Sequence, residues 1–67
     1  MLQPHQQRVI AEYDDLSQRL VSLRRFISDD TIFSTLPDED KDLLIQQRCL
    51  MAELQSVLAK RIARFNQ

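Results

Sequence analysis

Apolar side chains recur at heptad spacing through the first part of this chain. They follow steps of four, three, four, three and four residues and are Val9, Tyr13, Leu16, Leu20, Leu23 and Ile27. Steps of this kind place one apolar stripe along an amphipathic helix. Pro4 suits the first turn of such a helix, where its missing N–H is not needed. We therefore predict a helix over about residues 5–27, with Ile10 and Val21 flanking its stripe.

A second amphipathic helix is predicted over about residues 38–65. Proline is tolerated in a first helical turn and carboxylates favour the positive end of a helix dipole, so Pro37 and the acidic residues after it indicate a helix start. On a helical wheel, one broad apolar face contains Leu43, Leu50, Met51, Leu54, Val57, Leu58, Ile62 and Phe65. Gln47 and Arg61 lie within the same face although both are polar.

The connection over residues 28–37 is acidic at first and then apolar. The chain contains no glycine, the residue that tight hairpin turns between strands favour, so helices are expected instead of a β-sheet. We predict a loop containing about one helical turn. Ile32, Phe33 and Leu36 are expected to fold back against the end of the helix pair, because three large apolar side chains would otherwise stay in water. The fold predicted is all-α, a single-domain antiparallel hairpin covering residues 1–67.

Self-association is predicted because the chain is too short to bury much apolar surface alone. A domain of about this size removes only about 60% of its unfolded surface from water. Cys49 is the single cysteine, so no intrachain disulfide forms, and Cys49 and His5 stand on different predicted helices and make no metal site. We predict a homodimer in a four-helix bundle, with higher oligomers as an alternative. The residues expected to mediate it are Val9, Ile10, Tyr13, Leu16, Leu20, Leu23, Leu50, Leu54, Val57 and Leu58.

Charge is segregated along the chain although the net charge is only −1. Residues 28–42 hold six acidic residues against Lys41, whereas residues 43–67 hold four basic residues against Glu53. An antiparallel hairpin would gather Arg8, Lys60, Arg61 and Arg64 at the end opposite the acidic connection. One interpretation is compensation of the helix dipole, and the other is a receptor for phosphate or carboxylate. Arg61 and Gln47 have a further interpretation, as polar positions that fix the register of a bundle.

Several function classes are disfavoured by what the sequence contains. It offers no nucleophile paired with a base, no metal set and no phosphate-binding loop, so we predict a protein without cofactor or enzymatic activity. The net charge gives no general attraction to nucleic acid or anionic membranes. Apolar runs such as Leu43–Ile45 are too short for a membrane span or a signal peptide. The absence of a secretion signal and the free thiol of Cys49 together predict that the protein is located in a reducing cytoplasm.

The whole chain resembles a family of small phage and prophage accessory proteins described by relation to a crAss-like phage gene product. The matching residues are His5-Gln6-Gln7-Arg8-Val9, Glu12, Leu16, Leu23, Phe26-Ile27, Phe33, Leu36-Pro37, Met51, Leu58, Arg61-Ile62 and Phe65. Departures are Tyr13, where a lysine is more usual, and Leu54, where a tyrosine is more usual. The resemblance implies a viral origin and expression inside a bacterium.

Three functions are compatible with these expectations. The leading hypothesis is a homo-oligomeric bundle that occupies a surface of a host bacterial protein and inhibits antiphage defence. The second is a sponge that sequesters a nucleotide or other small anion between protomers, using Arg8, Arg61 or Arg64. The third is a nucleic-acid-associated regulator of the phage programme, whose DNA binding should weaken steeply with salt.

Overall fold

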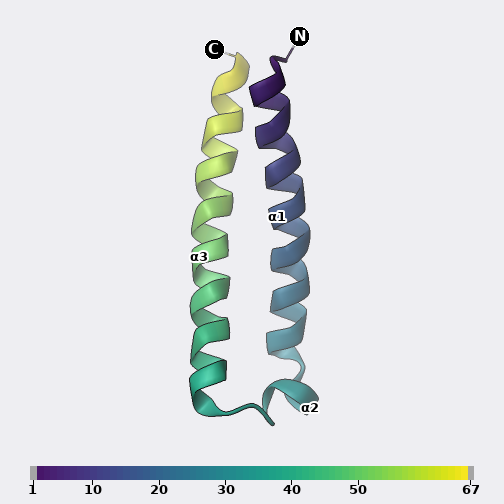
Figure 1. Cartoon of the computed structure of the whole chain (residues 1–67), viewed down its shortest axis with the longest axis vertical. Helices are drawn as coiled ribbons and strands as arrows, with labels where there is room; N and C mark the ends of the chain where they lie inside the picture. Colours follow the sequence, from purple (N-terminus) through teal and green to yellow (C-terminus); the bar gives the residue numbers. More distant parts are fainter. Residues whose placement is uncertain (1, 67) are drawn as a thin grey trace.

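Two long antiparallel helices make up almost all of this protein. The computed structural model describes residues 2–66 and contains α1 (Pro4–Ser28), the short α2 (Asp30–Phe33), α3 (Asp38–Ala63) and a final 3-10 turn, η1 (Arg64–Asn66). The start of α1 and the end of α3 lie side by side at one end of a rod, and α2 lies at the other (Figure 1). The rod measures 48 × 15 × 14 Å. The predicted all-α hairpin of two packed helices is confirmed.

Local sequence explains where each helix begins. The backbone N–H of Gln3 donates to Oε1 of Gln6 at 2.9 Å, and Pro4 fills the first helical position. Asp29 lies between α1 and α2 and forms a hydrogen bond to each of these helices. Its backbone N–H donates to the carbonyl of Phe26 at 3.2 Å, and its side chain accepts from the backbone N–H of Thr31 at 3.1 Å, capping α2. Within residues 2–66 no residue has positive φ, so this glycine-free connection turns through a short helix instead of a tight turn.

The core is a thin strip of side chains between α1 and α3. Val9, Leu20 and Leu58 are buried, with 6%, 0% and 1% of their surfaces exposed. All six residues of the stripe predicted for α1 are buried or half-buried. The buried and half-buried stripe of α3 continues into η1, has heptad spacing as well and consists of Leu44, Arg48, Met51, Gln55, Leu58, Ile62 and Phe65. We call these seven residues the inner stripe of α3.

The broad apolar face predicted for α3 is in fact two adjacent stripes, and only one is buried or half-buried in the hairpin. The second, which we call the outer stripe, has exposed fractions between 44% and 61% at its apolar members Leu43, Leu50, Leu54 and Val57. Each of these residues directly precedes an inner-stripe residue, so it lies about 100° further round a helix of 3.6 residues per turn. The wheel merged the stripes because it does not reveal where the neighbouring helix lies. It also left out Leu44 and Gln55, both half-buried in the structure.

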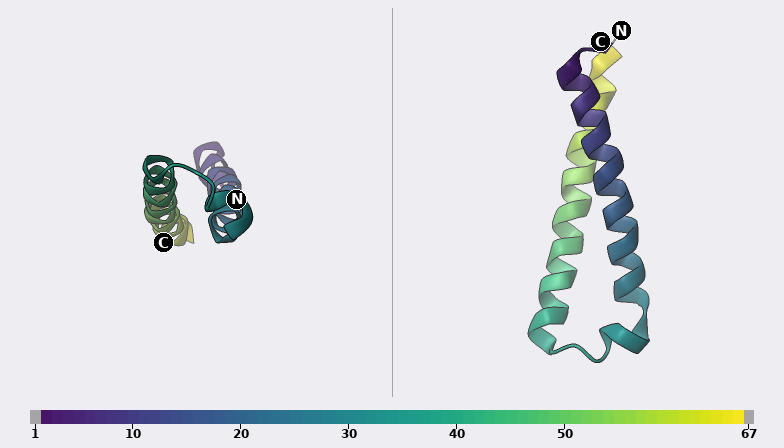
Figure 2. Two further views of the ribbon diagram at one scale, coloured as in Figure 1. Left: turned by 90° about the horizontal axis from the view of Figure 1, so that it is seen from below. Right: turned by 45° about the vertical axis from the view of Figure 1, so that its right-hand side comes forward.

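The two helices separate toward the connection. Figure 2 shows α1 and α3 close together near the chain ends and further apart near α2. At the connection Phe33 and Leu36 are half-buried, and the Lys41 Nζ atom lies 6.0 Å from the centre of the Phe33 ring. Ile32, in contrast, is 49% exposed, so the prediction that it folds back against the helix pair is wrong. Ile32 lies in the four-residue helix α2, none of whose residues is buried.

One side-chain hydrogen bond joins the long helices in the part of the chain that the structure describes. Nε2 of Gln55 donates to Oγ of Ser17 at 2.9 Å, and the bond is partly buried. We expect Ser17→Ala to lower the free energy of unfolding by about 1 kcal/mol, because Gln55 would lose its partner. The matched control is Ser22→Ala, an exposed site on the same helix, which should raise stability slightly through helix propensity. Equal changes in urea-unfolding midpoints for the two variants would contradict this.

Candidate ligand-binding end

Four basic residues lie near the end of the rod where the chain begins and finishes. Arg8 is in the second turn of α1, Lys60 and Arg61 are in the last turn of α3, and Arg64 begins η1. All four side chains are exposed. Because α1 and α3 run antiparallel (Figure 1), these residues come from opposite ends of the sequence but lie near the same end of the molecule. We call this group the basic end.

None of the four takes part in an ion pair found among residues 2–66. Those pairs are Arg19 with Asp15, at 3.1 Å, and Lys41 with Asp38, at 4.0 Å, and each lies within one helix. The acidic residues of the connection and of the first turn of α3 are at the far end of the 48 Å rod. Physiological salt screens the field of a charge over about 8 to 10 Å, so these distant carboxylates do not neutralise the basic end.

Helix-dipole compensation accounts for part of this charge but not for all of it. Lys60 and Arg61 lie in the last turn of α3, where a cation stabilises the negative end of the dipole. Arg8 lies near the start of α1, where a cation gains nothing from the dipole, and the first turn of that helix holds no acidic residue. Dipole compensation therefore does not account for Arg8.

Helix geometry places Arg8 and Arg61 on the same side of the hairpin. Arg8 directly precedes buried Val9, and Arg61 directly precedes half-buried Ile62. In two right-handed antiparallel helices, residues that precede an inward-facing residue lie on one common side of the pair. Grooves along the rod agree with this rule. One groove is lined by Asp15, Ser22 and Gln47 among others, and each of these three directly precedes an inward-facing residue. A groove on the opposite side is lined by residues that directly follow inward-facing residues, such as Arg24 and Cys49.

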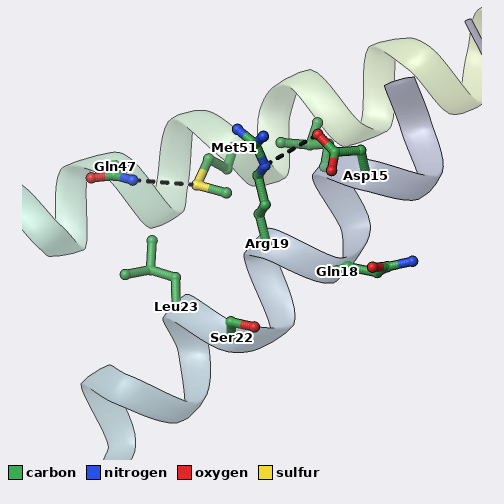
Figure 3. Close-up of a pocket in the computed structure, with 8 residues that line it drawn as sticks. Asp15, Gln18, Arg19, Ser22, Leu23, Gln47 and Met51 are labelled. Atoms are coloured by element: carbon green, nitrogen blue, oxygen red, sulfur yellow. Dashed lines mark hydrogen bonds and ion pairs between the residues drawn. The ribbon is translucent and has the colours of Figure 1, made fainter. Parts of the chain in front are cut away.

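The groove on the side of Arg8 and Arg61 runs between the helices where they begin to separate. Figure 3 shows its lining, in which Nε of Arg19 is paired with Oδ2 of Asp15 at 3.1 Å and Nε2 of Gln47 donates to Sδ of Met51 at 3.8 Å. The full lining is Asp15, Leu16, Gln18, Arg19, Ser22, Leu23, Gln47 and Met51. Its arginine already has a carboxylate partner, so an anion would find less positive charge here than at the basic end.

Comparison with known proteins identifies the family. The profile of a family described as Sequestin matches residues 3–64. The chain belongs to the Sequestin family. Neither the curated proteins nor the solved structures contain a match. The matched region runs from before Arg8 to Arg64 and so contains all four residues of the basic end within the Sequestin match. The match does not itself connect the chain with crAss-like phages.

The residues predicted for self-association divide into two groups in this Sequestin member. Val9, Leu20 and Leu58 are buried inside a single hairpin, so they form its core and are not available to a partner in this conformation. Leu50, Leu54 and Val57 are exposed on the outer stripe. The half-buried remainder, which contributes to the core and partly faces solvent, is Ile10, Tyr13, Leu16 and Leu23.

Cys49 and His5, the two potential soft metal ligands of the sequence, do not lie together. Cys49 is exposed and lines a groove on the opposite side with Arg24 and Arg48. His5 is exposed in the first turn of α1. Within residues 2–66 no three metal-ligating side chains come together, and no helix has the length and apolar character needed to cross a membrane. The Ser17–Gln55 pair was missed by sequence reasoning because both residues are polar and sit between apolar positions.

Proposed function

We propose that this protein is a non-catalytic binding protein that sequesters a small anionic ligand at its basic end. The observation that carries the proposal is that Arg8 and Arg61, from different helices, lie on the same side of the hairpin near one end, with Lys60 and Arg64 at that end and none of the four in the described ion pairs. The name of the family, Sequestin, supports a sequestering role.

The chemistry of the basic end favours phosphate or carboxylate groups. A guanidinium presents a planar fork of N–H donors that matches two oxygens of such an anion, and it stays charged at any physiological pH. Two such forks from different helices suit a ligand with more than one anionic oxygen, such as a nucleotide. Among the residues that the structure describes, no nucleophile paired with a general base accompanies them, so the ligand is expected to be released unchanged.

Titration calorimetry against a panel of anions tests this proposal. The panel is inorganic phosphate, a mononucleotide, a linear dinucleotide and a cyclic dinucleotide. We expect at least one nucleotide to bind with saturable heat and to be recovered intact after the protein is denatured. Flat titrations for the whole panel at low salt would overturn the anion proposal, and chemical conversion of a bound ligand would overturn its non-catalytic part.

A protein target is a second candidate, favoured by the exposed outer stripe of α3. Four apolar side chains that are 44–61% exposed along one helix form a surface that a protein partner could cover. The host bacterial protein, the phage setting and the cytoplasmic location inferred from sequence belong to this candidate and remain predictions. A pull-down from bacterial lysate tests it. A stoichiometric partner that is lost on Leu54→Arg would favour it, whereas a gel shift with DNA at low salt would favour the nucleic-acid alternative.

A further inference from the structure

The outer stripe of α3 has the spacing of a helix that packs against another helix. Its positions follow steps of four, three, four, three and four residues, the pattern of a heptad seam. They are Leu43, Gln47, Leu50, Leu54, Val57 and Arg61. In a rod only 15 × 14 Å across, a single copy has no further layer to cover them. The four apolar members therefore stay 44–61% exposed in one hairpin.

We propose that a second copy of this chain packs its own outer stripe on this one, with the two α3 helices antiparallel. The stripe is symmetric about its centre, so reversing one copy brings every position opposite another stripe position. Leu50 then lies opposite the partner's Leu54, and Gln47 lies opposite the partner's Val57. Leu43 lies opposite the partner's Arg61, where it covers the aliphatic stem of that side chain.

Charge along α3 selects the antiparallel orientation over the parallel one. The first turn holds Asp38, Glu39 and Asp40, whereas the last turn holds Lys60 and Arg61 and is followed by Arg64. In the antiparallel register Asp40 lies opposite the partner's Arg64, at both ends of the pair. A parallel pair would instead set acid against acid at one end and base against base at the other, which is unfavourable at each.

The same register argues for a second copy as the occupant of the stripe. An isologous contact needs a surface that is complementary to itself after a two-fold rotation. The outer stripe and its flanks meet this condition, since Leu50 opposes the partner's Leu54 at the centre, and Asp40 and Arg64, three residues beyond the two ends of the stripe, are opposite in charge. This inference does not rest on the proposed ligand. It assigns Arg64 and the aliphatic stem of Arg61 to the contact between copies, and leaves Arg8, Lys60 and the Arg61 guanidinium for an anion.

Disulfide trapping tests the orientation directly. In a Cys49→Ser background, Leu43→Cys and Arg61→Cys are made as separate proteins, then mixed and oxidised. The antiparallel pair should give the mixed disulfide as the main product, identified by its mass. Leu43→Cys alone is the matched control and should stay largely uncrosslinked. Efficient self-crosslinking of Leu43→Cys would overturn the orientation, and no crosslink in any mixture would overturn the contact. Leu43 is 61% exposed, so its substitution should leave the hairpin folded.

A charge swap tests the same contact without new cysteines. Arg64→Asp should weaken self-association about tenfold in sedimentation, because both copies lose an opposite-charge contact and gain a like-charge one. Adding Asp40→Arg should restore the wild-type dissociation constant. Arg24→Asp, the same charge change on the opposite side of the hairpin, should have little effect. Association unchanged by Arg64→Asp, or no recovery in the double variant, would overturn the register. Loss of anion binding in the calorimetric panel leaves these outcomes unchanged, so the two proposals fail separately.

Discussion

Replacing Leu58 by alanine should leave most of the protein unfolded at 25 °C. Leu58 is 1% exposed and is the fully buried leucine of α3. Truncating a buried leucine to alanine typically costs about 3 to 5 kcal/mol, since the lost methyl groups leave a cavity. A single core in a chain of this size rarely supplies more than about 3 to 5 kcal/mol in total. The loss is therefore about as large as the stability available.

The control for this prediction is the same substitution at an exposed position of the same helix. Leu43→Ala removes the same atoms from a side chain that is 61% exposed, so it should change the unfolding free energy by well under 1 kcal/mol. Urea titrations followed by circular dichroism at low protein concentration compare the two variants. Equal losses would mean that the core does not lie between α1 and α3. Repeating them at high concentration separates the contribution of self-association.

The first long helix was predictable almost completely from the sequence. Its heptad steps gave one stripe, and each of the six residues from Val9 to Ile27 in that stripe is buried or half-buried. The predicted helix over residues 5–27 compares with Pro4–Ser28 in the structure. Periodicity was sufficient here because α1 has one apolar stripe that faces one neighbour, so no choice between faces arose.

The second long helix shows where periodicity stops being informative. Its apolar residues cover two adjacent stripes, and either one could have faced α1. Pairs such as Leu50 and Met51 or Val57 and Leu58 are neighbours in sequence and lie about 100° apart on a helix, so one broad face drawn on a wheel includes both. Contact with α1 decides between them, and it selects Met51 and Leu58 for the inside. The Ser17–Gln55 hydrogen bond follows from that choice and could not be predicted without it.

The basic end was predictable in composition but not in detail. Antiparallel packing of two helices of similar length was enough to bring Arg8 near Arg61 and Arg64. Which side of the hairpin each arginine occupies depends on which residues face inward, and that required the structure. For the same reason, sequence alone left open whether Arg61 belongs to the core, to an interface or to a ligand site. It is exposed in the hairpin and continues the outer stripe.

The double substitution Arg8→Gln with Arg61→Gln should weaken binding of the tightest anion in the calorimetric panel about a hundredfold. Each guanidinium that contacts an anion at an exposed site contributes about a factor of ten, and the two come from different helices. Glutamine keeps most of the side-chain length and removes the charge and the planar fork. Both positions are exposed, so the hairpin should remain folded, which circular dichroism checks.

The matched control removes the same charge elsewhere on the same rod. Arg24→Gln with Arg25→Gln changes two exposed arginines near the other end of α1 and should reduce affinity less than about threefold through the general field alone. Raising the salt from 50 to 500 mM should weaken wild-type binding more than binding to the basic-end variant, because that variant has lost the charges that salt screens. Equal losses in both double variants would indicate attraction by net charge, and wild-type affinity in the Arg8 and Arg61 variant would place the ligand elsewhere on the hairpin.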